Sequence, residues 1–257
     1  MDRSKFYTSL RQRNSGVFGT SLSPRQVKGV DAILDACEAA GATLFQTAYI
    51  LATPYGETGG RMVSVRENLN YSAAQIAKHF GAHRRQGKSP QQLARNPVLL
   101  GNTVYGGQWG RDHLGNTQPG DGYNFRGFGI GQWTGRHNTE KAAAAVGLDL
   151  VGKPELLDDA KINARLLVDW MMNGRATGRK LGEFVTDTRK DYHGARAVWG
   201  GVDADKYVGF AQAFEAALKA GGWGTQPAFV DHTPPKTTQS PLVALFAAIA
   251  AIFRRKP

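Results

Sequence analysis

The sequence contains little cysteine, few acidic residues and no long apolar run at its start. The single cysteine, Cys37, excludes a disulfide within the 257-residue chain, and its place in an apolar helical pattern indicates a buried small side chain rather than a nucleophile. The opening residues MDRSKFYTSLRQRNSG lack the apolar run of about seven residues that a secretory signal needs. We therefore expect synthesis in the cytoplasm without a signal peptide.

The shortage of acidic residues gives the chain a strong positive charge. Against 32 Lys and Arg stand 21 Asp and Glu, so the formal net charge is +11. Such a charge favours polyanionic partners, and nucleic acid, anionic lipid and bacterial cell wall all qualify. Because no zinc-finger, basic-zipper or RNP-type aromatic pattern is present, we expect no nucleic-acid partner.

Two N-terminal segments have the period of core helices. In SLSPRQVKGVDAILDACEAAG, Ser23 is a predicted N-cap, Pro24 the first helical residue and Gln26 the partner of a capping box, with a glycine closing the helix. The next segment, TLFQTAYILATPYGE, is also helical by pattern, but Pro54 and Gly56 should distort or stop it near the first glutamate. Glu57 is therefore expected at a helix end, facing a cavity.

The rest of the first 223 residues predicts more helix and little sheet. DDAKINARLLVDWMMNG and DADKYVGFAQAFEAALKAGG have helical spacing, acidic starts and glycine stops. Residues 101–137 are rich in glycine and aromatics, which favours tight loops and a short strand pair around Tyr123 to Gln132. We therefore predict a mainly α, lysozyme-like (α+β) domain over residues 1–223, with a small β region lining the cleft.

The composition changes after Trp223. Residues 224–240 are rich in Pro and Thr and are predicted to be a linker. Residues 241–257 begin with PLVALFAAIAAIF and end in basic residues; as a helix the apolar part would be only about 18 Å long, short of the roughly 30 Å hydrocarbon core. This tail has three open interpretations: an interfacial membrane segment, a docking element or a buried terminal helix. Its basic end favours contact with an anionic membrane.

Two glutamates stand close together in GETGGRMVSVRENLNYS, at positions 57 and 67. Hydrolysis of a glycosidic bond needs one protonated carboxyl group for the leaving oxygen and one carboxylate that activates water or attacks carbon. Two such residues ten positions apart are ordinarily solvated surface charges, so the pair needs support from its surroundings.

That support comes from a resemblance. ETGG…RENLNYS followed by GDGYNFRGFGIGQWTGRHN resembles the family 19 glycoside hydrolases, chiefly phage endolysins related to chitinases. LSPRQVKGVDAILDACE, AYILAT, GLDLVGKPELL, TGRKLGEF and AFEAAL agree, so the resemblance covers residues 6 to 220. It implies that Glu57 is the general acid, that Glu67 is the general base and that the anomeric configuration inverts. Inverting enzymes hold these carboxyl groups roughly 6.5–9.5 Å apart.

The resemblance also implies the surroundings of the acid pair. Thr134 corresponds to a hydroxyl residue that helps to hold the attacking water. The expected substrate-binding residues, which would stack on sugar rings or hydrogen-bond to them, are Tyr105, Tyr123, Arg126, Gln132 and Asn138.

Three positions depart from the family pattern. Gly56 stands where many members have histidine, Phe128 replaces an arginine, and Trp199 replaces an asparagine. Pro54 and Gly56 are expected to alter the aim of Glu57. Phe128 and Trp199 would trade polar contacts for sugar stacking, and for Trp199 core packing is the alternative.

Metal and nucleotide sites are not expected. His79 and His83 have the spacing of two ligands on one helix face, but HExxH is incomplete and Gly81 weakens the helix. RGFGIGQ follows no apolar strand and precedes no lysine, so it does not indicate a phosphate loop. No cofactor is implied.

The sequence therefore predicts a monomeric phage-type endolysin that cleaves β-1,4 bonds between aminosugars of peptidoglycan. It would be made in the host cytoplasm and would act on the wall in the periplasm after holin-type permeabilisation of the membrane. Two alternatives stay open: a chitinase acting on N-acetylglucosamine polymers, and a non-catalytic wall-binding or virion component.

Overall fold

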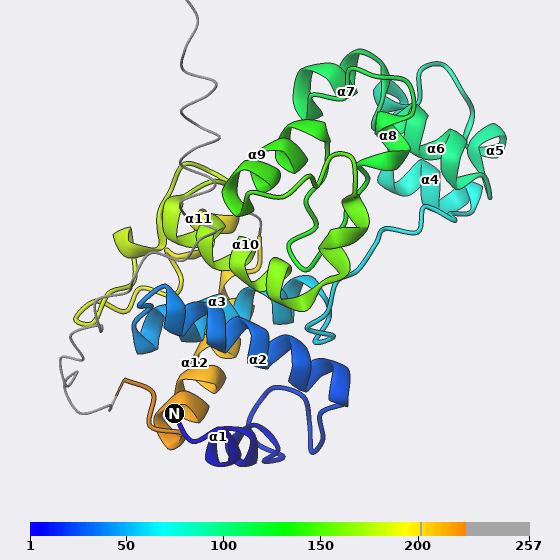
Figure 1. Ribbon diagram of the computed structural model, residues 1–257. Coiled ribbons are helices and arrows are strands. Elements are labelled where there is room, and N and C mark those ends of the chain that lie inside the picture. The colour runs from blue at the N-terminus through cyan, green and yellow to red at the C-terminus, as the bar shows by residue number, and fades with distance from the viewer. Residues whose placement is uncertain (201, 225–257) are drawn as a thin grey trace, which may run out of the picture. The chain divides into compact units, whose positions relative to one another are not determined.

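The computed structural model describes residues 1–200 and 202–224, and Met1–Gly224 form one compact unit (Figure 1). The predicted tail at 241–257, and the predicted linker apart from Gly224, lie outside the described residues. The helices are, in chain order, α1 (Arg3–Leu10), α2 (Pro24–Ala39), α3 (Leu44–Glu57), α4 (Ala73–His79), η1 (Ala82–Arg84), α5 (Pro90–Leu93), α6 (Pro97–Val104), α7 (Gly107–Leu114), α8 (Asp121–Asn124), α9 (Arg136–Val146), η2 (Pro154–Asp158), α10 (Ala160–Asn173), η3 (Leu181–Glu183), α11 (Arg196–Trp199) and α12 (Ala204–Ala220), where η denotes a 3-10 helix.

The prediction of a mainly helical fold is confirmed. Within the described residues there is no sheet, and β structure is limited to two isolated bridges, Phe128–Trp133 and Val185–Lys190. The strand pair expected around Tyr123 to Gln132 was wrong in extent, because Tyr123 lies in α8 and only the Phe128–Trp133 bridge forms. The glycine-rich turn between these two residues passes through positive φ at Gly129 and Gln132, which bends the chain too sharply for longer strands.

Local sequence signals explain the start of α2 and both ends of α3. Ser23 and Gln26 form the predicted capping box at the start of α2. Helix α3 continues through Pro54 and ends at Glu57, which confirms the expected position of this glutamate at a helix end. Its last turn closes at Thr58, whose backbone N–H (2.9 Å) and hydroxyl (2.7 Å) both donate to the Pro54 carbonyl oxygen.

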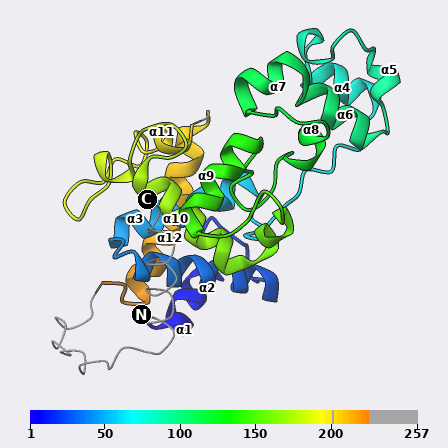
Figure 2. The ribbon, with the colours of Figure 1, turned by 45° about the horizontal axis from the view of Figure 1, so that its top comes forward.

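The described residues pack around two hydrophobic cores. The larger core includes side chains of α1, α2, α3, α10 and α12. The smaller one lies among α4, α5 and α6 and is formed by Leu69, Ile76, Phe80, Leu93, Leu100 and Val104. Figures 1 and 2 show α4–α8 grouped apart from α1–α3 and α10–α12. The segment from Glu57 to Glu67 leaves the larger group in the direction of the smaller one.

None of the helices within residues 1–200 and 202–224 combines the length and apolar character that a membrane span requires.

Candidate active site

Glu57 is held at the end of α3 by two residues from the C-terminal part of the chain. Its Oε1 accepts a hydrogen bond from the Tyr207 hydroxyl at 2.9 Å. The same oxygen forms an ion pair with Arg196 Nη1 at 3.1 Å. The Arg196 guanidinium also lies over the Tyr207 ring, 3.9 Å from its centroid. Both polar contacts engage Oε1, and the side chain is 25% exposed. The carboxylate is therefore oriented at one oxygen while part of it still meets solvent.

Burial keeps Tyr207 a hydrogen-bond donor. Burial, followed by its hydrogen bond to Glu57, raises the pKa of Tyr207 to about 12. The hydroxyl therefore stays protonated throughout the pH range in which the protein would work.

The structure explains why glycine stands at position 56, the first departure from the family pattern. A Cβ added there would lie 2.6 Å from Cζ and 2.7 Å from Oη of Tyr207. No side chain fits between α3 and the tyrosine that bonds Glu57. Gly56 is therefore the residue that lets Tyr207 reach Glu57.

Gly56→Ala is expected to lower the stability of the protein by about 1–3 kcal/mol, because the added methyl group overlaps the Tyr207 ring. It should also reduce hydrolytic activity by about tenfold or more, since Glu57 loses its fixed orientation. Thermal unfolding and glycan hydrolysis would measure both effects. Gly209→Ala in α12 is the matched control, because nothing lies within 4 Å of the added methyl group. Equal behaviour of the two variants would contradict the assignment.

Glu67 lies on an extended segment that runs beside the glycine-rich turn. Its backbone N–H donates to the Gly127 carbonyl oxygen at 2.8 Å, and Val65 N–H donates to Gly129 at 3.4 Å. Arg126 Nε donates to the Glu67 carbonyl oxygen at 2.7 Å. The backbone of the second glutamate is thus fixed on both sides by the segment that also carries Gln132 and Thr134.

The Glu67 carboxylate has one hydroxyl partner that bridges both of its oxygens. The Tyr105 hydroxyl lies 2.9 Å from Oε1 and 3.0 Å from Oε2. Burial raises the pKa of Glu67, and the Tyr105 hydrogen bond with the positive charges of Arg126 and Arg84 opposes this rise. These opposing groups favour the ionised form of Glu67, the form that a general base would need.

Gln132 and Thr134 approach Gly127, whose carbonyl oxygen accepts the Glu67 backbone N–H. A Cβ added at Gly127, the residue bonded to Glu67 N–H, would lie 2.6 Å from Gln132 Oε1 and 3.4 Å from Thr134 Oγ1. Gln132 Nε2 also donates to the Val65 carbonyl oxygen at 2.6 Å. The structure thus brings an amide and a hydroxyl side chain to the glycine that is bonded to the Glu67 backbone.

The remaining candidate substrate-binding residues support this group. Asn138, in the first turn of α9, donates from Nδ2 to the Thr134 carbonyl oxygen at 2.9 Å. Arg126 is only 8% exposed; its guanidinium lies over the Tyr123 ring, 3.9 Å from its centroid. In the free protein Arg126 therefore positions Glu67 and Tyr123, and direct sugar contact by these residues stays a prediction.

Tyr105→Phe is expected to reduce activity by roughly tenfold, because the variant loses the hydroxyl that donates to the ionised Glu67. Losing that bond raises the pKa of Glu67 further, so the acidic limb of the pH–rate profile should move to higher pH. The measurement is the pH dependence of glycan hydrolysis. Tyr71→Phe is the control, because that hydroxyl makes no hydrogen bond to Glu67. A Tyr105→Phe profile that overlays the wild-type profile would argue against a role for this bond.

The two aromatic departures differ in exposure. Phe128 is 4% exposed in the larger core, and its ring is covered by the Arg66 guanidinium at 4.7 Å, so the proposed stacking of Phe128 on sugar was wrong. Trp199 is partly buried, and a Cβ added at Gly131 would lie 2.9 Å from its Cζ2. Trp199 therefore packs against the glycine-rich turn, and sugar stacking by its exposed part stays a prediction.

Sequence reasoning missed three residues that support the acid pair. Arg196 and Tyr207 lie 139 and 150 residues from Glu57, so no spacing rule connects them to it. Arg84 lies over the Trp109 ring at 4.0 Å and the Tyr105 ring at 5.1 Å, and so orders the tyrosine that bonds Glu67. The only sequence signal was compositional: an arginine among aromatic residues.

The two histidines with ligand-like spacing lie on different elements. His79 ends α4, whereas His83 lies in the separate 3-10 helix η1. Across the described part of the chain, no group of three or more His, Cys, Asp or Glu residues is placed to hold a metal ion.

The helical fold thus holds two tyrosine-bonded glutamates, Glu57 on Tyr207 and Glu67 on Tyr105. No model of a known protein family matches the chain. A protein of Haemophilus influenzae described as "Glycosyl hydrolase family 19 domain-containing protein" is 33% identical over 138 residues, which are 53% of this chain and 67% of the relative. The chain belongs to this family of proteins with a glycosyl hydrolase family 19 domain.

Proposed function

We propose that this protein hydrolyses β-1,4 glycosidic bonds between the aminosugars of bacterial peptidoglycan, as a phage-type endolysin acting in cell lysis. The observation that carries the proposal is the acid pair: Glu57 oriented by Arg196 and Tyr207, and Glu67 held by Tyr105. Membership of the glycosyl hydrolase family 19 domain proteins supports glycosidase chemistry. The net charge of +11 favours peptidoglycan over chitin, because the wall carries carboxylates and chitin is uncharged.

In the proposed reaction, Glu57 donates its proton to the glycosidic oxygen as the bond from this oxygen to the anomeric carbon breaks. A water held by Thr134 attacks the anomeric carbon from the opposite face and gives its proton to the ionised Glu67. The net change is addition of one water, with inversion of the anomeric configuration. Gln132 and Asn138 hydrogen-bond the substrate or this water, and Tyr105 and Tyr123 contact sugar rings.

The direct test is release of reducing ends from purified Gram-negative peptidoglycan, with chitin oligomers assayed in parallel. We expect release from peptidoglycan, products whose masses identify the cleaved bond, and an α-anomer as the first product by NMR. Release from chitin oligomers alone would instead make the protein a chitinase. A folded protein that binds the wall but releases nothing from either polymer would have a non-catalytic role.

The proposal includes the cellular setting. The enzyme would act on the wall in the periplasm after another component, such as a holin, opens the inner membrane, and residues 241–257 would contact anionic lipid. Expression in Gram-negative cells should cause lysis only when the membrane is permeabilised separately. Deletion of residues 241–257 should reduce binding to vesicles containing anionic lipid while hydrolysis of purified peptidoglycan continues.

A further inference from the structure

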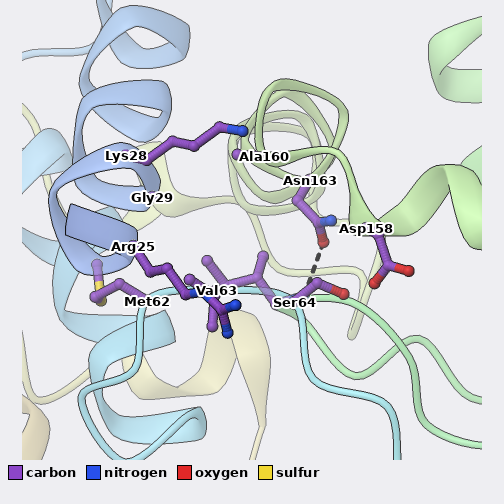
Figure 3. A pocket seen from close by; sticks show the side chains of 10 residues that line it. Arg25, Lys28, Gly29, Met62, Val63, Ser64, Asp158, Ala160 and Asn163 are labelled. Carbon is purple, nitrogen blue, oxygen red and sulfur yellow. Dashed lines mark hydrogen bonds between the residues drawn. The ribbon is translucent and has the colours of Figure 1, made fainter. Parts of the chain in front are cut away.

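A pocket of about 390 Å³ lies beside the segment that leads to Glu67 (Figure 3). Neither glutamate of the acid pair lines it, so it is separate from the contacts described above. Its walls come from the start of α2, the loop after Glu57, the glycine-rich turn, and the junction between η2 and α10. The residues that matter for its chemistry are Arg25, Lys28, Ser64, Asp158 and Asn163.

Close packing attaches this pocket to the candidate active site. A Cβ added at Gly29 of α2 would overlap the Met62 carbonyl oxygen, so helix and loop are in direct backbone contact. Gln26 Nε2 donates to the Gly60 carbonyl oxygen at 2.8 Å. The loop that joins the two glutamates is therefore fixed against α2, and one wall of the pocket belongs to that loop.

The opposite wall is fixed in the same way. Asn163 in α10 is 2% exposed, and its Oδ1 accepts a hydrogen bond from Ile130 N–H at 2.8 Å. Ile130 lies two residues before Gln132, in the turn that pairs with the Glu67 segment. A ligand in the pocket would therefore touch two segments that also build the candidate site.

The polar groups around the pocket have opposite charges on opposite sides. Figure 3 shows Arg25 and Lys28 extending from α2, with Asp158 across the pocket beyond Asn163. Among the described residues, none of these three charged side chains forms an ion pair. The buried Ser64 hydroxyl has no hydrogen-bond partner within the same part of the chain. The pocket thus offers two cations on one side and one anion on the other.

We propose that this pocket is a subsite for the stem peptide of peptidoglycan, with carboxylates of the peptide on Arg25 and Lys28 and the ammonium group of its diamino acid on Asp158. This inference rests on the proposed function and adds to it a reason for choosing peptidoglycan. Chitin has no group that would use these charges. Ser64 precedes Glu67 by three residues, so their Cα atoms lie at most about 11 Å apart, within reach of a peptide on a sugar beside the cleaved bond.

The first experiment measures binding without catalysis. The free tripeptide L-alanyl-γ-D-glutamyl-meso-diaminopimelate is titrated into the full chain by calorimetry. Arg25→Gln with Lys28→Gln should weaken binding by about tenfold. Lys141→Gln with Lys153→Gln removes the same charge from residues outside the pocket and should change binding less than twofold. No binding by the wild type, or equal weakening in both double variants, overturns the proposal.

Two further probes identify the ligand chemistry. Asp158→Asn should weaken binding of the tripeptide but not of the dipeptide L-alanyl-D-glutamate, which lacks the second ammonium group. Inorganic phosphate tests for a general anion site: if phosphate binds in an Arg25- and Lys28-dependent manner and the tripeptide does not, the stem-peptide assignment is wrong.

The second experiment uses glycan strands with and without stem peptides, prepared with an amidase. The Arg25 and Lys28 double variant should raise KM about tenfold on peptide-bearing glycan while kcat and hydrolysis of bare glycan stay within twofold of wild type. An equal loss on both glycans contradicts the proposal. If no glycan is cleaved but the tripeptide still binds through Arg25 and Lys28, the pocket assignment is supported and the proposed hydrolysis fails.

Discussion

Glu67→Gln is expected to lower the rate of glycan hydrolysis by roughly 10²–10⁴-fold, the usual contribution of a general base. The amide keeps the size of the side chain and can still accept the Tyr105 hydrogen bond, but it cannot take a proton from water. The loss should appear in kcat, because the substrate contacts remain. Initial rates of reducing-end release, with the variant at high concentration, measure it.

Glu67→Gln should lose activity without losing stability, and measuring its stability is therefore the control for folding. Burial raises the pKa of Glu67 in the folded protein, so the folded state binds this proton more tightly than the unfolded chain does. The resulting stability is present at low pH and is lost as pH rises through the folded pKa. Glu67→Gln should therefore melt no lower than wild type at pH 7, and any advantage should shrink as pH falls. A variant that melts well below wild type would show a structural role instead.

Azide distinguishes a missing base from a damaged site. This anion attacks carbon without giving up a proton, so it should restore turnover to Glu67→Gln and yield a glycosyl azide of inverted configuration. A variant without azide rescue, with normal folding and substrate binding, would contradict the role of Glu67 as base.

Local signals in the sequence were sufficient for the start of α2 and the end of α3. The capping box of Ser23 and Gln26 and the helix end at Glu57 depend on residues within one helical turn, so pattern reasoning finds them. The strand pair near Phe128 was overestimated, because aromatic residues favour strands while the alternating glycines let the backbone turn. The composition of this stretch was readable from the sequence, but its backbone φ angles were not.

The site was predictable only where its members are close in sequence or belong to a known motif. Thr134 and Gln132 came from the resemblance, and the structure places both beside Gly127. Arg196 and Tyr207 reach Glu57 through the packing of α12 on α3, a long-range contact that no spacing rule encodes. Gly56 was recognised as a departure, but its cause lies 151 positions away, in the ring of Tyr207.

Glu57→Gln is expected to reduce hydrolysis of natural glycan by roughly 10²–10⁴-fold, because the leaving oxygen then departs without a proton. Unlike Glu67→Gln, this variant should also melt below wild type. Arg196, whose side chain is 10% exposed, would lose its counter-charge and keep only hydrogen bonds to the amide. Rates on glycan and thermal unfolding at pH 7 measure the two effects.

A change of leaving group in the substrate tests whether Glu57 is the acid. A dinitrophenyl glycoside has a leaving group that needs no protonation, so Glu57→Gln should cleave it within about tenfold of the wild-type rate, whereas Glu67→Gln should not. Azide should give the reverse pattern, rescuing Glu67→Gln alone. If Glu67→Gln were rescued by the leaving group and Glu57→Gln by azide, the two roles would be exchanged. The two carboxyl groups differ in burial and partners. Reciprocal rescue by the leaving group and by azide separates the acid from the base without relying on the pKa of either group.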